Sequence, residues 1–229
     1  MTEIERNGKE FFFAFENFDR EISKKLVSQR VNADQLMEIL VHELRTTPLT
    51  PAELQHLNSC YRHLSAFPFD NIYPNYLTHP IRVAASFART LDAVTIDDIT
   101  LALCHNIRET GFAETIDTEG RFLTASVRNC IETLTIDRAQ ERDKAYLGEF
   151  YDRIAAVSES LMLFKALDKL DNMLSYVQDD LESYHFGVVT EFVCPRVDES
   201  YPEVARYLRD LTHYVQTDSA KARFRVINE

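Results

Sequence analysis

The sequence predicts an all-α protein, built as a bundle of helices around one core. Of its 229 residues, 45% are hydrophobic, while only 5 are glycine and 7 are proline. No strand-like alternation of apolar and polar residues continues for more than a few positions. Leu163, Leu167, Leu170 and Leu174 instead recur at helical spacing along one stripe. We therefore expect helices along most of the chain.

Helix-start signals support this expectation at several points. Thr50-Pro-Ala-Glu53 combines a Thr cap, a Pro at the first helical position and a Glu that completes a capping box. Thr95 is followed by Asp98 in the same way, and Gly111 supplies a natural end for the helix that begins there. Pro80 fits the first turn of another helix, because that position needs no amide hydrogen.

The expected elements follow in chain order. The pattern predicts helices near residues 9–28, 33–44, 51–64 and 80–91, a helix from Thr95 to Gly111, helices near 122–134 and 138–156, a helix from Ser158 or Ser160 to about Val177, and a last helix near 202–216. Loops are expected near 67–76, 112–121 and 185–200. We expect one domain over residues 1–229, with N-terminal helices 1–48 packed on a core 50–180 and a helical extension 181–229. The aromatic side chains of 9–28 either pack within the chain or form a homodimer contact.

The charge balance limits the partners of the protein. The chain has 25 basic and 37 acidic residues, a net charge of −12. Nucleic acid is disfavoured as a partner, because binding its phosphates needs a basic surface. A small phosphorylated substrate needs only a local basic pocket and is compatible with this charge.

The cysteines and the hydropathy pattern indicate the compartment. The 4 cysteines are scattered, with no Cys-x-x-Cys spacing, which is typical of buried free thiols in a reducing environment. No run approaches the roughly 20 apolar residues of a membrane span, and no signal-peptide pattern is present at the N-terminus. We expect a soluble cytoplasmic protein that does not bind membranes.

Polar groups interrupt two predicted buried helices. His105 and Asn106 are adjacent within the apolar run that ends near Ile107, and Glu109 follows His105 by one helical turn. His79 opens a second apolar helix. Polar groups inside a protein cost free energy unless they are paired or bind a ligand.

A third predicted helix carries a polar stripe beside its leucine stripe. Lys165, Asp168 and Asn172 recur at helical spacing on a different face. We expect the bundle to be built around His79, His105-Asn106 and Asp168.

Two imidazoles and a carboxylate suit one divalent metal ion. We expect His79, His105 and Asp168 to be ligands, with the uncharged amide oxygen of Asn106 available as a further one. The alternative is that these are paired polar groups of the core. Arg82 lies near His79 and either meets a substrate phosphate or points outward from its helix.

Three sequence motifs resemble those of HD-domain metal phosphohydrolases, in particular the RelA/SpoT-type alarmone hydrolases, which remove a pyrophosphate from ppGpp. Tyr76-Leu-Thr-His-Pro-Ile-Arg-Val-Ala84 is similar to the family's Tyr-Ile-x-His-Pro-x-x-Val-Ala. Ala102-Leu-Cys-His-Asn-Ile-Arg-Glu-Thr-Gly111 is similar to Leu-Leu-His-Asp-x-x-Glu-Asp-Thr, and Lys165-Ala-Leu-Asp-Lys-Leu-Asp-Asn172 to Lys-Leu-Ala-Asp-Arg-Leu-x-Asn. The motifs occur in the family's order over roughly residues 55–180.

This resemblance implies an HD-domain helical bundle with a metal-dependent activity on a nucleotide-like pyrophosphate or phosphate ester. Glu109 would orient or deprotonate the attacking water, and Lys165 and Asn172 would contact substrate phosphate or sugar. Mn²⁺ is the metal that the resemblance favours, with Zn²⁺, Fe²⁺ and Mg²⁺ as alternatives. No histidine lies between His105 and Asp168, which favours one metal ion rather than two.

The chain also departs from the family pattern. Asn106 replaces the Asp of the His-Asp pair, Thr110 replaces the Asp after the catalytic Glu, and residues 67–74 contain no basic residue to pack on a purine. These changes leave a second interpretation open. The chain would then be a degenerate HD domain that binds a nucleotide or a protein partner without turnover.

Overall fold

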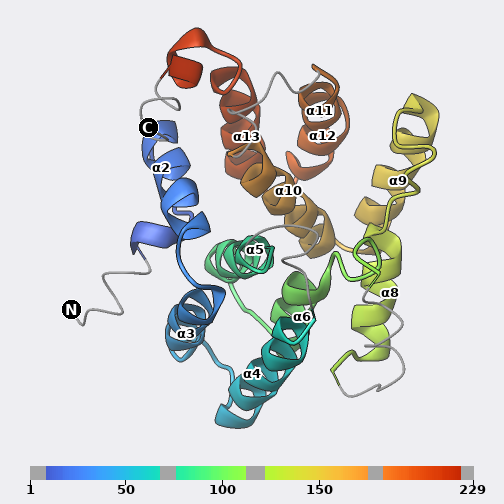
Figure 1. Ribbon diagram of the computed structural model, residues 1–229. Helices are drawn as coiled ribbons and strands as arrows, with labels where there is room; N and C mark the ends of the chain where they lie inside the picture. Colours follow the sequence, from blue (N-terminus) through green and yellow to red (C-terminus); the bar gives the residue numbers. More distant parts are fainter. Residues whose placement is uncertain (1–8, 68–75, 112–121, 175–182, 223–229) are drawn as a thin grey trace. The chain divides into compact units, whose positions relative to one another are not determined.

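The computed structural model describes residues 9–67, 76–111, 122–174 and 183–222. Within these ranges all regular secondary structure is helical, which confirms the all-α prediction (Figure 1). The helices are α2 (Phe18–Gln29), α3 (Ala33–Leu44), α4 (Pro51–Ser65), α5 (Thr78–Thr90), α6 (Ile96–Cys104), α8 (Ala125–Leu134), α9 (Lys144–Val157), α10 (Glu159–Met173), α11 (Ser183–Val188), the π-helix η3 (Val189–Val193), α12 (Cys194–Val197) and α13 (Pro202–Tyr214). The predicted loops at 67–76 and 112–121 lie almost wholly outside the described residues.

The helices group into two compact units, each made of two pieces of chain. The first consists of Met1–Ala14 and Val27–Thr135, and the second of Phe15–Leu26 and Ile136–Glu229. The predicted grouping of residues 1–48, 50–180 and 181–229 into one domain stays a prediction.

In the first unit, α5 packs against α3 and α6, α4 packs against the same two helices, and α8 packs against α6. The α5 helix is buried almost all round, and its Arg82 is fully buried with the apolar residues. The Arg82 guanidinium donates to the Phe11 carbonyl and, at 3.1 Å, to the Ser28 hydroxyl. These two bonds tie the N-terminal segment and the end of α2 to α5.

In the second unit, α10 packs against α9, α12, α13 and η3. Eleven of its 15 residues are buried, including Asp168 and Asp171. The α2 helix joins this unit through Lys25, whose ammonium pairs with the Asp171 carboxylate. Asp171 is buried because this partner, distant in sequence, covers it.

The helix caps that were expected from sequence are present. Thr50 with Glu53 and Thr95 with Asp98 each form a complete capping box, in which side chain and backbone satisfy each other's hydrogen bonds. Ser158, rather than Ser160, caps α10, where its hydroxyl accepts from the Leu161 amide at 3.0 Å.

The predicted helix 9–28 is wrong over residues 12–17, which are not helical. The carbonyls of Phe11 and Phe13 accept from the side chains of Arg82 and Arg89 instead of from helix amides. Phe15 then takes a left-handed conformation, with φ of 54°, which a residue with a side chain rarely adopts. The helix therefore begins again only at Phe18.

Two further boundaries differ from the prediction. The α9 helix begins at Lys144 rather than near 138, because the Asp143 side chain caps it by accepting from the amides of Ala145 and Tyr146. The predicted loop 185–200 is wrong over most of its length, because α11, η3 and α12 follow one another directly. No helix in the described part of the chain has the length and apolar character needed to cross a membrane.

Candidate metal centre

His105 lies at the point where α6 ends. The sequence predicted a helix running to Gly111, but the α-helix stops at Cys104 and residues 105–111 form turns. The His105 Nδ1 atom lies 2.7 Å from the Ala102 carbonyl oxygen. In a continued helix that oxygen would accept from the Asn106 amide. The imidazole therefore occupies the acceptor that the next helical turn would use.

This contact also fixes the proton of His105. A carbonyl oxygen only accepts, so the bond requires the hydrogen on Nδ1. In the neutral imidazole, Nε2 then keeps its lone pair, which is the form of histidine that binds metals. His105 is 3% exposed, so the ring is held inside the protein.

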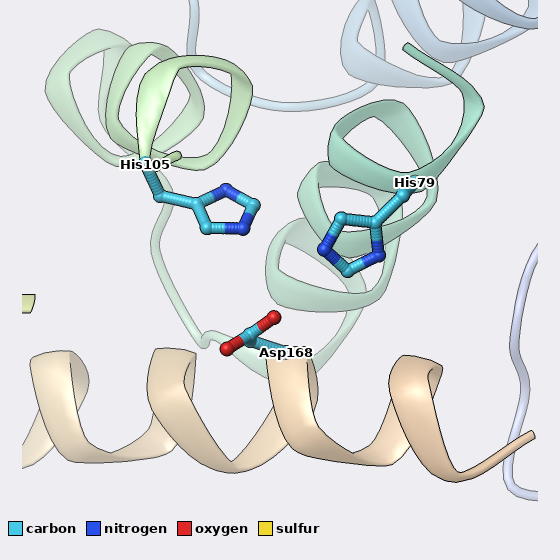
Figure 2. Close-up of side chains that lie close together, drawn as sticks. All are labelled: His79, His105 and Asp168. Atoms are coloured by element: carbon cyan, nitrogen blue, oxygen red, sulfur yellow. The ribbon is translucent and has the colours of Figure 1, made fainter. Parts of the chain in front are cut away.

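His79 lies in the first turn of α5, half-buried. Its ring faces that of His105, with the centroids 5.3 Å apart and the planes 67° from parallel (Figure 2). The two predicted histidines are therefore brought together by α5 and α6, which pack against each other.

Asp168 is 3% exposed and stands on α10 between two polar neighbours. Asn172 donates to its Oδ1 atom at 3.1 Å, and the Lys165 ammonium lies 3.0 Å from its Oδ2 atom. The polar stripe predicted for this helix is therefore a connected group of side chains. Asn172 and Lys165 orient the carboxylate, which keeps further lone pairs on both oxygens.

His79, His105 and Asp168 form a group that could hold a metal ion. Their ligand atoms all lie within 4.8 Å of one another (Figure 2). The donor set, two imidazoles and a carboxylate oxygen, suits a borderline or hard divalent ion such as Zn²⁺, Fe²⁺ or Mn²⁺. The Nδ1 hydrogen bond of His105 fits this role, because metal-bound histidines typically donate their second nitrogen to a carbonyl or carboxylate.

Tyr151 on α9 is a neighbour of this group that the sequence did not reveal. Burial raises the pKa of Tyr151 to about 12, with Lys165 acting to lower it and Asp168 to raise it. The phenol therefore stays neutral beside the Lys165–Asp168 pair. Nothing in the local pattern of α9 distinguishes this tyrosine from its buried aromatic neighbours.

The other predicted site residues are placed differently. Asn106 is half-buried in the turn after His105, and its carbonyl accepts from the amides of Glu109 and Thr110. Glu109 is exposed on this turn. Because residues 105–111 form turns and not a helix, the spacing of one helical turn does not place Glu109 beside His105. Arg82 is fully buried and bonded to Phe11 and Ser28, which gives it a structural position.

Comparisons of the chain with family models, with curated proteins and with solved structures found no match. The HD-domain assignment therefore stays a prediction that rests on the three sequence motifs. The structure shows in addition that the rings of His79 and His105 lie next to each other and that Asp168 has polar neighbours.

Proposed function

We propose that this protein is a single-metal phosphohydrolase that acts on a nucleotide-like pyrophosphate or phosphate ester. One observation carries the proposal: His79, His105 and Asp168, predicted as ligands from separate motifs, have ligand atoms within 4.8 Å of one another. The substrate class comes from the resemblance of the three motifs to alarmone hydrolases.

When bound, a divalent ion supplies Lewis acidity that polarises a phosphoryl oxygen and makes water more acidic. His79 and His105 would hold it as neutral ligands, and Asp168 would contribute the negative charge. Mn²⁺ is the ion we propose, following the resemblance. Asn106 would offer an uncharged oxygen, which leaves the set with one negative charge fewer than a His-Asp pair.

The remaining polar groups have roles toward substrate and proton. Lys165 carries a positive charge beside Asp168, where it would attract a phosphate group. Asn172 holds the carboxylate in place and has one amide hydrogen left for a phosphate or sugar oxygen. Glu109 would accept the proton of the attacking water, which requires its turn to move toward the ligands.

The net charge of −12 and the four free cysteines support the rest of the proposal. The charge argues against nucleic acid as a substrate. The thiols of Cys60 and Cys104 lie 3.7 Å apart, at hydrogen-bond distance, and form no disulfide, which is consistent with the reducing, cytoplasmic environment that we propose.

Metal analysis followed by product release tests the proposal. The purified protein would be stripped of metal, titrated with Mn²⁺ in a calorimeter, and assayed for phosphate and pyrophosphate release across a panel of nucleotides. We expect about one ion per chain, release that depends on Mn²⁺, and loss of both in Asp168→Asn. Asp210→Asn is the matched control, because Asp210 is exposed on α13 and makes the same change in charge. Wild-type protein that binds neither Mn²⁺ nor Zn²⁺ at saturation would contradict the proposal.

A second candidate function has its own supporting observation. The Lys165 ammonium already neutralises Asp168, and Asn106 adds no charge, so the polar group is stable in its paired form without an ion. The chain would then be an HD-like module that binds a nucleotide without turnover. Nucleotide binding that persists in excess chelator, with no product released, would support this function over hydrolysis.

A further inference from the structure

A groove between α3 and α4 is separate from the candidate metal centre. Its volume is about 690 Å³, and it is open along one side. Its lining runs from the end of α3 through the connection to α4 and then along α4 itself, and includes Val41, Arg45, Leu49, Leu54, Asn58 and Arg62. The two helices pack against each other within the first unit (Figure 1).

Two exposed arginines, Arg45 and Arg62, line this groove. Within the described residues neither Arg45 nor Arg62 has an ion pair, although acidic residues outnumber basic ones by 37 to 25 in the chain. Among the described residues, the acidic residues nearest to them along the chain are engaged elsewhere. Glu43 binds Arg89 at 2.6 Å, and the Glu53 carboxylate caps α4 through Thr50.

Apolar side chains also line the groove. Leu54, Asn58 and Arg62 follow at intervals of four residues and so share one face of α4. Eight residues of helix span about 12 Å, which separates Leu54 from Arg62 along the groove. Leu49 and Leu54 are half-buried, and Val41 lines the groove from α3. Asn58 donates to the Leu54 carbonyl at 3.2 Å, which leaves its side-chain oxygen to accept from a ligand.

We propose that this groove binds an acidic, amphipathic peptide segment of a partner protein. Charge complementarity identifies the occupant: the two exposed guanidinium groups attract carboxylates, and the leucines that line the same groove favour an apolar side chain. A single small anion would use one arginine and leave the apolar side chains uncovered. A helical segment that carries carboxylates and a leucine on one face matches both kinds of side chain that line the groove.

The position of the arginines has a simpler explanation that the test must separate. Arg45 is the C-cap of α3 and Arg62 lies in the last turn of α4, where positive charge stabilises a helix end. That role accounts for the charges but predicts no ligand. If this were their only role, reversing the charge of Arg45 or Arg62 would change the melting temperature but would not change peptide binding.

Fluorescence polarisation with a designed probe tests the proposal on the full chain. The probe is a labelled helical peptide with glutamates eight positions apart and a leucine between them; a second probe replaces the leucine with serine. We expect saturable binding of the first probe, with affinity about fivefold to tenfold lower in Arg45→Glu and in Arg62→Glu, because each reversal turns an attraction into a repulsion. Leu54→Gln and the serine probe should each weaken binding as well.

Arg206→Glu is the matched control, since Arg206 is an exposed arginine of α13 and does not line the groove. The affinity of this variant for the leucine probe should stay within about twofold of wild type. A charge far from the groove acts on the probe only through solvent, where salt screens it. Three results would overturn the proposal: no saturable binding of the leucine probe, equal loss in all three arginine variants, or complete displacement by tripolyphosphate with no effect of the leucine. The last result would identify a small-anion site instead.

Discussion

Lys165 and Asp168 form an ion pair one turn apart on α10, with 3.0 Å between the ammonium and the Oδ2 atom. Both side chains are almost fully buried. A cation that binds Asp168 must share the carboxylate with this lysine. In the proposed site, the lysine would therefore weaken metal binding while it attracts the substrate phosphate.

Removing the lysine charge should separate these two effects. In Lys165→Met, we expect tighter Mn²⁺ binding, because a positive charge next to the ligand set is lost, and slower hydrolysis, because the substrate phosphate loses its attraction. Calorimetry and product release measure the two directions independently. Lys144→Met, which removes an exposed lysine on α9, should change neither. Weaker metal binding in Lys165→Met would show that the lysine organises the carboxylate rather than competing for it.

Asn106 follows His105 at the position where the resemblance places an Asp, so we expect metal affinity to depend on it. Asn106→Asp is nearly isosteric and restores a carboxylate beside His105, so we expect Mn²⁺ affinity to rise by about tenfold or more, since unit charges at about 4 Å attract by a few kcal/mol even when partly screened. The melting temperature should then rise with added Mn²⁺, because the ion binds only the folded state. Asn129→Asp on the exposed face of α8 is the control. If Asn106→Asp and wild type both stay free of metal at saturating Mn²⁺ or Zn²⁺, the polar groups are structural.

Breaking the buried Lys25–Asp171 pair should destabilise the protein strongly, whereas replacing both residues by apolar ones should destabilise it little. Lys25→Met alone leaves the Asp171 charge buried without this partner, and we expect it to lower the free energy of unfolding by about 3–5 kcal/mol. The double variant Lys25→Met with Asp171→Leu should recover most of this loss, because apolar side chains then fill the same space. Urea denaturation of the four proteins measures the cycle. Additive losses in the double variant would contradict the pairing.

The Thr95 capping box should be a measurable part of the stability of α6. Thr95→Ala removes the side-chain oxygen that accepts from the Asp98 amide at 3.2 Å, and should cost about 0.5–2 kcal/mol in the free energy of unfolding. Thr95→Ser keeps the oxygen and should recover most of it. Equal losses in the two variants, measured by urea denaturation, would mean that the threonine methyl group matters and the cap does not.

Tyr151 predicts a loss of stability at alkaline pH. Its pKa is about 12 in the folded protein and about 10 when exposed, so the unfolded chain releases the proton first. The contribution of Tyr151 to the free energy of unfolding is fully present below pH about 10 and falls as the pH rises toward 12. Tyr151→Phe should flatten this fall in unfolding experiments across that range. Tyr61 and Tyr207, whose pKa values are also raised by burial, should leave a residual slope in the variant.

Features governed by near neighbours could be predicted from the sequence. The capping boxes at Thr50 and Thr95 and the two stripes of α10 depend on residues three or four positions apart, and all are present. The all-α fold class could be predicted from the same local signals. The histidines could be predicted because each stands out against an apolar helix.

Features that depend on distant contacts could not be predicted. The carbonyls of Phe11 and Phe13 accept from arginines more than 70 positions away, and this interrupts the expected first helix. Asp171 is buried because Lys25, 146 positions earlier in the chain, pairs with it. At the end of α6 the His105 ring contacts the Ala102 carbonyl oxygen, and helix propensity does not describe such a side-chain contact.

The two-piece composition of each compact unit has a consequence for synthesis of the chain. Residues 15–26 belong to the second unit, but the ribosome makes 27–135 before any other part of that unit. At the usual elongation rates this interval lasts on the order of 5 to 20 s. Throughout it, Glu21, Lys24 and Lys25, which end up buried, stay hydrated and without α10. Charged side chains favour contact with water over association with other segments, which an apolar segment of the same length would not do.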